Sequence, residues 1–228
     1  MLRPARSLAV SQPQRLAPSV RVAARRTPLE GVRLLGALAV AVAAMVAAVV
    51  AVEGAGEPGV RAVIRWTARS SLVLFLAAFA ASSARRLWRV PATAWLLRNR
   101  RWVGLSFAFS HALHLVGIAV LATRFPAAFE PEPATLVGGG LGYVFVAAMA
   151  ATSSDAAVRR LGARRWRLLH KTGAWVLFAI FAQNYLVAPF FDPRYAPLGL
   201  ATAGAAGLRV AAWWRGRGAH QAPAASVR

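Results

Sequence analysis

The sequence predicts an all-α, polytopic membrane helical bundle with about six transmembrane helices and both termini in the cytoplasm. The first observation is composition, since the 228 residues are 58% hydrophobic and only 15% charged, with a mean hydropathy of +0.50. Soluble domains are about 45–50% apolar and about 25% charged. The second observation is that long apolar segments alternate with short basic ones. The third is that the basic residues gather on alternate sides of these segments.

The apolar segments define the expected helices. A bilayer core of about 30 Å requires about 20 predominantly apolar residues, because lipid offers the backbone no hydrogen-bond partner outside the helix itself. Arg65 and Arg69 weaken the start of the second segment, and the sixth is rich in Ala and Gly. In chain order the segments are residues 32–52, 63–83, 102–122, 134–152, 166–187 and 198–214.

These segments divide the chain into three parts. Residues 1–31 form a basic arm that we expect to be irregular, and residues 32–215 form the transmembrane domain. Residues 216–228 form a cytoplasmic tail. The first apolar segment starts at Leu34, which is later than in a signal peptide, so we expect the arm to be retained.

The distribution of charge predicts the orientation. Of the 28 cations, 23 lie in residues 1–33, 85–101, 159–171 and 209–228, and five lie on the opposite side, where five of the seven acids also lie. Cytoplasmic loops collect Lys and Arg, so both termini are predicted to be inside. Topology and attraction to anionic membrane lipid account for the net charge of +21. Nucleic-acid binding is not expected, because such proteins concentrate their cations on one face or domain.

The candidate functional residues are histidines. The chain has no cysteine, which excludes disulfides, thiolate metal sites, iron–sulfur clusters and thiol nucleophiles. His111, His114 and His170 lie inside predicted transmembrane segments, where ionisable groups are rare and are functional candidates by default. His220 lies in the tail and is expected to be solvated. No catalytic residue is assigned.

The spacing of these histidines suggests a haem site between two helices. His111 and His114, three residues apart, share one helix face, and His170 opens the fifth segment. A b-type haem needs a neutral imidazole from one or both of two helices. The alternative is that each imidazole bonds a neighbouring carbonyl or hydroxyl group.

Depth in the membrane gives a first estimate of which histidines pair. From the basic residues that precede each segment, at 1.5 Å per residue, His111 lies about 15 Å in, His114 about 20 Å and His170 about 8 Å. His111 therefore matches the depth of His170 better than His114 does. The residue nearest His114 in depth is Gln183.

Three motifs resemble the ferric reductase-like transmembrane family. They are Arg-Arg-x-x-Gly-Leu from Arg100, Leu-His ending at His114, and Arg-Arg-Trp-x-x-Leu-His ending at His170. Two shorter runs also resemble this family. One is Thr152-Ser153, between the second and third motifs, and the other is Thr67-Ala-Arg69, in the second apolar segment. The resemblance covers roughly residues 60–190. It is nearest to the haem-binding membrane subunits of bacterial periplasmic methionine sulfoxide reductase systems.

The resemblance implies a b-type haem that moves electrons across the bacterial inner membrane. His114 matches the family's ligand on the third helix, and His170 its inner histidine on the fifth, so both are candidate ligands of the haem iron. Gln183 stands where the family usually has a further histidine. His111, where the family often has an aromatic residue, is a further cofactor-binding candidate that could pair with His170.

The resemblance also implies partners. Only 14 residues follow the sixth segment, so we expect the electron donor, a flavoprotein or a quinone, to be separate and the acceptor to lie outside the membrane. Arg69 either extends to the outer headgroups or pairs with a haem propionate. The glycines of residues 138–142 are expected to allow close helix packing. The alternative is a haem-free membrane protein of the same fold, acting as a transporter, assembly factor or anchor, which Gln183 favours.

Overall fold

The protein is an all-α membrane bundle, as predicted. A computed structural model describes residues 29–221, in which there is no strand. Five of the helices are long and apolar enough to span a membrane: α1, α2, α3, α4 and α6. The number of spans and the side on which the termini lie remain predictions. The helices are α1 (Val32–Glu53), α2 (Glu57–Leu87), α3 (Pro91–Arg124), α4 (Pro133–Ala151), α5 (Asp155–Leu161), α6 (Ala163–Val187) and α7 (Ala196–Gln221).

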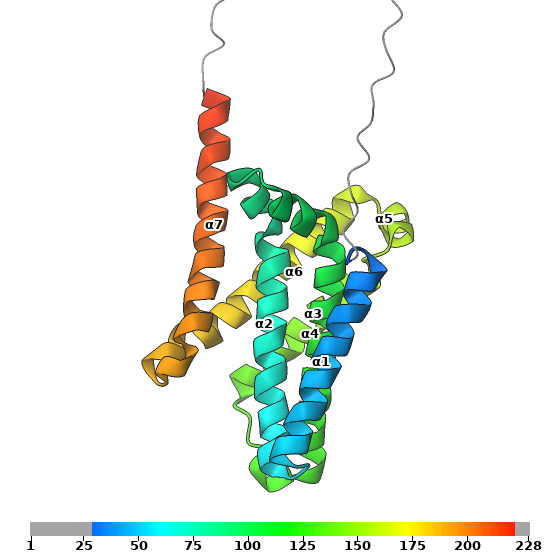
Figure 1. Cartoon of the computed structure of the whole chain (residues 1–228), viewed down its shortest axis with the longest axis vertical. Coiled ribbons are helices and arrows are strands. Elements are labelled where there is room, and N and C mark those ends of the chain that lie inside the picture. The colour runs from blue at the N-terminus through cyan, green and yellow to red at the C-terminus, as the bar shows by residue number, and fades with distance from the viewer. Residues whose placement is uncertain (1–28, 222–228) are drawn as a thin grey trace, which may run out of the picture.

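The helices α1, α2 and α3 lie side by side, with α4 and α6 behind them (Figure 1). The longest helix, α3, runs back along α2 after a short turn, and α7 packs on α2 and α6. In Figure 1, α6 is inclined to the other helices, so its connection to α7 lies above the lower end of α2. That connection contains the 3-10 turns η2 (Ala188–Phe190) and η3 (Pro193–Tyr195).

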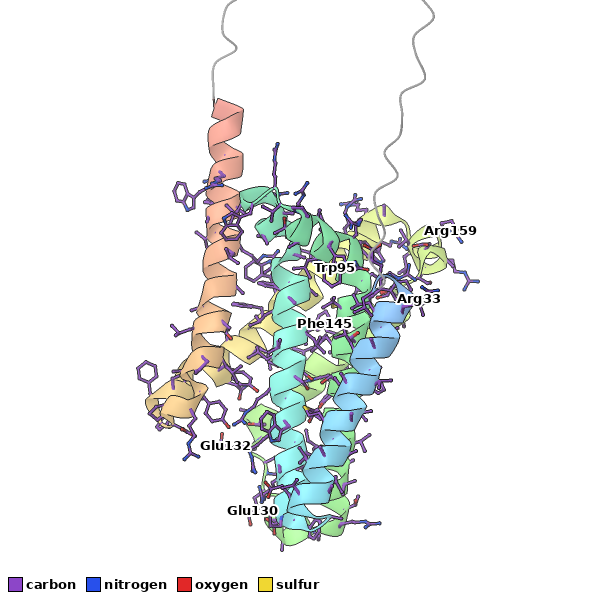
Figure 2. The ribbon with its side chains drawn as sticks, in the orientation of Figure 1. Arg33, Trp95, Glu130, Glu132, Phe145 and Arg159 are labelled. Carbon is purple, nitrogen blue, oxygen red and sulfur yellow. The ribbon has the colours of Figure 1, made fainter. Side chains whose placement is uncertain are left out.

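The two ends of the bundle differ in charge. Figure 2 shows Glu130 and Glu132 toward the lower end, and Arg33, Trp95 and Arg159 at the upper end. We call the upper one the basic end and the lower one the acidic end. The distribution of basic residues on alternate sides of the apolar segments predicted this separation of charge.

Aromatic rings form the core where α2, α3 and α6 meet. Phe75 lies 5.4 Å from Phe107 and 5.2 Å from Phe181 between ring centroids, and Phe79 stacks on Phe178 at 4.8 Å. Lipid tails are as apolar as these side chains, so close packing rather than the hydrophobic effect favours this contact.

The helices α4 and α6 approach closely at glycines. A Cβ atom on Gly142 would lie 3.2 Å from Ile180, and one on Gly173 would lie 2.5 Å from the sulfur of Met149. Of the glycines in residues 138–142, the structure thus gives Gly142 the packing role that the sequence predicted.

Several helix bounds differ from the predicted segments. Helices α2 and α3 have 31 and 34 residues and extend beyond the apolar segments into basic residues. Helix α5 was not predicted, and Ser154 caps it by accepting a hydrogen bond from the backbone N–H of Ala157. Helix α7 continues to Gln221, past the predicted end at 214. Most of the predicted arm, residues 1–28, lies outside the described residues.

Candidate functional site

Hydroxyl groups line the contact between α2 and α3. Ser110 of α3 lies 2.8 Å from Ser70 and 3.0 Å from Ser71 between hydroxyl oxygens, and it donates to the carbonyl of Thr67. Ser71, Ser110 and Thr67 are fully buried. These short polar side chains fix the register of the two helices.

His114 lies at the end of this row of hydroxyls. Its Nδ1 atom is 3.0 Å from the carbonyl oxygen of Ile64 and 3.2 Å from Oγ1 of Thr67. A carbonyl oxygen only accepts, so Nδ1 carries a hydrogen and donates it. The hydroxyl of Thr67 donates to the carbonyl of Val63 at 2.7 Å and can accept from the same imidazole N–H. In the neutral ring, Nε2 therefore keeps its lone pair and is the nitrogen able to bind a metal.

His111 lies among aromatic rings from three helices. Its ring is 4.7 Å from that of Tyr143 of α4, 5.9 Å from Phe181 of α6 and 5.3 Å from His114. Its Nδ1 atom and the hydroxyl oxygen of Tyr143 are both buried with no hydrogen-bond partner. Such orphaned polar atoms are costly in a bundle interior, and they indicate a place where a further polar group would be stabilised.

His111 and His114 lie on one face of α3, with their rings 5.3 Å apart, and would not both hold the same haem iron. Side chains three residues apart on a helix have Cβ atoms about 5–6 Å apart and lie on the same face. A haem held between two helices would take one imidazole from each of them. At most one of this pair is therefore a ligand to a given iron.

His170 lies in a separate polar site formed by α4 and α6. Its Nε2 atom is 3.0 Å from the hydroxyl oxygen of Thr152, and its ring stacks on Trp166 at 4.2 Å. The hydroxyl of Thr152 donates to the carbonyl of Ala148 at 2.6 Å, so it accepts from Nε2–H of His170. In this conformation the lone pair of His170 is on Nδ1.

The structure brings His111 and His114 together and leaves His170 apart from them. His111 contacts α6 at Phe181, which is eleven residues beyond His170 and so about 16 Å further along the helix. The pairing of His111 with His170 that depth suggested is therefore not found. The estimate assumed equal helix starts, whereas α3 begins at Pro91, well before its apolar segment, and α6 is inclined (Figure 1).

Gln183 and Arg69 have different surroundings. Gln183 is exposed, two residues past Phe181. Arg69 packs its guanidinium between the rings of Trp66 and Tyr195, at 5.1 and 5.0 Å from the centroids. Its Nε atom is buried without a partner, so this arginine is directed into the protein at η3 and retains an unused donor.

The sequence of this chain is similar to those of known proteins. A family model described as ferric reductase like transmembrane component matches residues 65–181. The chain belongs to the ferric reductase-like transmembrane family. Proteins named protein-methionine-sulfoxide reductase heme-binding subunit MsrQ are its relatives, and the one from Ralstonia nicotianae is 34% identical over 166 residues, or 70% of this chain and 74% of the relative. The relative from Bordetella parapertussis is also 34% identical, over 68% of this chain and 74% of its own length. No solved structure matches the chain significantly.

The surroundings of His114 meet the requirements for binding haem. A haem iron needs a neutral imidazole nitrogen with a free lone pair, oriented by a hydrogen bond on its other nitrogen. His114 has both properties. His170 meets them through Nε2 only if its bond to Thr152 is released.

Sequence reasoning missed the partners of these histidines. Ile64 bonds His114 through its main-chain carbonyl, and no pattern of residue types predicts such a contact. Tyr143 belongs to α4, and the sequence does not show which face of α4 lies against α3. The contact of Thr67 could have been predicted from the sequence. Thr67 lies with Ser70 and Ser71 on one face of α2, and hydroxyl groups in a transmembrane segment indicate a polar contact between helices.

Proposed function

We propose that this protein binds b-type haem through His114 and serves in the transfer of single electrons across the membrane. The observation that carries the proposal is the hydrogen bond from Nδ1–H of His114 to the carbonyl of Ile64. This bond uses Nδ1, so the lone pair of Nε2 points away from Ile64 and is free to bind iron. The names of the relatives, which call them heme-binding subunits, support the same cofactor.

The bound haem would supply a one-electron iron couple. This chain's residues would orient and tune it. The carbonyl of Ile64 and the hydroxyl of Thr67 hold the ring of His114 and increase the basicity of its free nitrogen. Phe107 and Phe181 are buried beside His111 and keep the surroundings dry, which would favour the less charged state of a bound haem.

His170 is the candidate ligand of a second position, nearer the basic end. It lies about 16 Å along α6 from the level of His111. Electrons that cross a hydrocarbon core of about 30 Å travel a shorter distance in each step when cofactors lie at two depths than when there is only one. His111, on the same face of α3 as His114, is a candidate to hydrogen-bond a cofactor substituent through its unpartnered Nδ1 atom.

The partners follow from the relatives and from the topology. A separate flavoprotein or a quinone would donate electrons, and the protein would reside in a bacterial inner membrane, since the relatives are bacterial. Their name also supports a methionine sulfoxide reductase as the acceptor, which we expect to lie outside the membrane. Arg164, Arg165 and Arg167, at the basic end, would then face the donor.

A second candidate is a haem-free protein of the same fold, acting as a transporter, assembly factor or anchor. The exposure of Gln183, at a position where the family usually has a histidine, favours it. In that case His114 and His170 would serve only to join helices through the bonds described above.

The colour of the purified protein separates the two candidates. Full-length protein from haem-replete cells should show a Soret band that shifts on reduction with dithionite. A colourless preparation that remains so after incubation with haem would favour the haem-free candidate.

A further inference from the structure

An apolar groove runs between α2 and α7. Its volume is about 490 Å³. Val73, one of its lining residues, is 55% exposed, so the groove opens to the bilayer rather than to the histidines. Its other lining residues are Leu72, Leu76, Ala80, Leu198, Ala201, Gly204, Ala205 and Leu208.

The groove has the length of one lipid leaflet. From Leu198 to Leu208 it covers ten residues of α7, or about 15 Å, which is half of a hydrocarbon core of about 30 Å. A Cβ atom on Gly204 would meet nothing within 4 Å. The space in front of this glycine is therefore free for another molecule.

Two arginines of α7 lie beyond the end of the groove that faces the basic end. Arg209 directly follows Leu208, donates to the carbonyl of Phe79 at 3.1 Å, and packs on the rings of Phe79 and Trp175 at 4.0 and 4.8 Å. Arg215 donates to the carbonyl of Leu87 at 3.1 Å. Both guanidinium groups thus lie at the contact between α7 and α2. Each uses one donor in these bonds, out of five.

Within residues 29–221, no ion pair joins either of these arginines to an acidic residue. Arg86 and Arg100 interact with Arg209, and both repel it. The three ion pairs in the described part of the chain involve Arg61, Arg98 and Arg101 instead. Arg209 is half-buried and Arg215 is exposed. A half-buried cation without a counter-ion is costly near a membrane, so an anion at Arg209, with Arg215 further along the same helix, would be stabilised.

We propose that the groove between α2 and α7 binds an anionic phospholipid, with an acyl chain along Gly204 and the headgroup phosphate at Arg209 and Arg215. A phosphate accepts several charge-assisted hydrogen bonds from guanidinium groups. An apolar groove that ends in unpaired cations fits a lipid better than it fits a protein helix, which would leave the cations unpaired.

Native mass spectrometry of the full-length protein tests this site. Delipidated protein is incubated with equal amounts of phosphatidylglycerol and phosphatidylcholine that carry the same acyl chains. We expect the wild type to prefer phosphatidylglycerol at least about fivefold, the gain that one arginine near an anionic headgroup contributes. The double variant Arg209→Gln/Arg215→Gln should lose the preference, and Arg209→Lys/Arg215→Lys should keep most of it.

The groove itself is tested by Gly204→Leu, which fills the space and keeps every charge. It should lower the binding of both lipids at least about fivefold. Gly138→Leu is the matched control, because Gly138 also has nothing within 4 Å of an added Cβ. Arg65→Gln/Arg124→Gln is the control for charge, since both residues are exposed and lie away from the groove.

The comparison of lipids can overturn the proposal in two ways. One is a wild type that binds the two lipids equally, as it would if a protein partner filled the groove. The other is a phosphatidylglycerol preference that survives Arg209→Gln/Arg215→Gln. If that variant does not fold by circular dichroism, unchanged lipid binding in Gly204→Leu overturns the proposal on its own.

Discussion

The Nδ1 atom of His114 lies 3.0 Å from the main-chain carbonyl oxygen of Ile64. This bond joins the candidate haem ligand on α3 to the backbone of α2, so the orientation of the imidazole depends on how closely the two helices pack. The carbonyl has two lone pairs, and it can accept from His114 while it remains part of the helix.

Thr67→Val tests the second acceptor beside His114. Valine keeps the shape of the fully buried threonine and removes the hydroxyl 3.2 Å from Nδ1. We expect haem affinity to fall about tenfold or more, as for other partners of metal-bound histidines. Titration of the apoprotein with haem, followed by absorbance, measures the change. Thr123→Val is the control, because its hydroxyl bonds only carbonyls of its own helix.

Gly117→Val tests the dependence on helix packing. A Cβ atom at Gly117, one turn after His114, would lie 2.9 Å from a side-chain carbon of Ile64. A valine there should force α2 from α3 at a cost of about 1–3 kcal/mol, lengthen the bond from His114 to Ile64 and reduce bound haem. Thermal unfolding and haem content are the measurements.

The matched control for this substitution lies on the same helix. Gly104 has nothing within 4 Å of an added Cβ, so Gly104→Val should change neither property. Equal haem loss in both variants would mean that the contact with Ile64 does not orient the ligand.

The sequence predicted the fold because its strongest signals are physical requirements of a bilayer. Apolar length and the position of arginines identified α1, α2, α3, α4 and α6. The ends of α2 and α3 were missed, because the helices continue into basic residues where hydropathy falls. Helix α5 was missed because it is short and polar, although Ser154 at its start and Gly162 after its end are ordinary helix boundary signals.

The candidate site could be predicted only in part. Rare residue types in apolar segments identified His111, His114 and His170. Their grouping could not be deduced from depth, because helix inclination moves residues by many ångströms. His111 contacts Phe181, which lies about 16 Å along α6 from His170.

The separation of His170 from His114 predicts independent effects on cofactor content. In the haem-loaded protein, His170→Ala should remove only haem bound near the basic end, and His114→Ala only haem bound near Phe181. Because the two sites share no hydrogen-bond partner in the structure, the losses in the double variant should add. Haem stoichiometry by the pyridine haemochrome assay measures this. Loss of all haem in both single variants would place the two histidines on one iron.

Gln183→His asks whether α6 can regain the histidine that the family usually has. Gln183 is exposed, whereas Phe181 is the residue of α6 that contacts His111. We therefore expect the absorbance spectrum and the haem stoichiometry of Gln183→His to equal those of the wild type. A new spectral component in this variant would show that the side chain at 183 turns toward the cofactor when haem is bound.

The most direct test of the account is the absorbance spectrum of His114→Ala beside those of the wild type and His220→Ala, all purified from haem-replete cells. The wild type and His220→Ala should show a Soret band that shifts on reduction, and His114→Ala should show a weaker band, because it loses the haem bound near Phe181 and retains the haem at His170. A His114→Ala protein with the wild-type spectrum and haem affinity would contradict the assignment of His114 as the iron ligand.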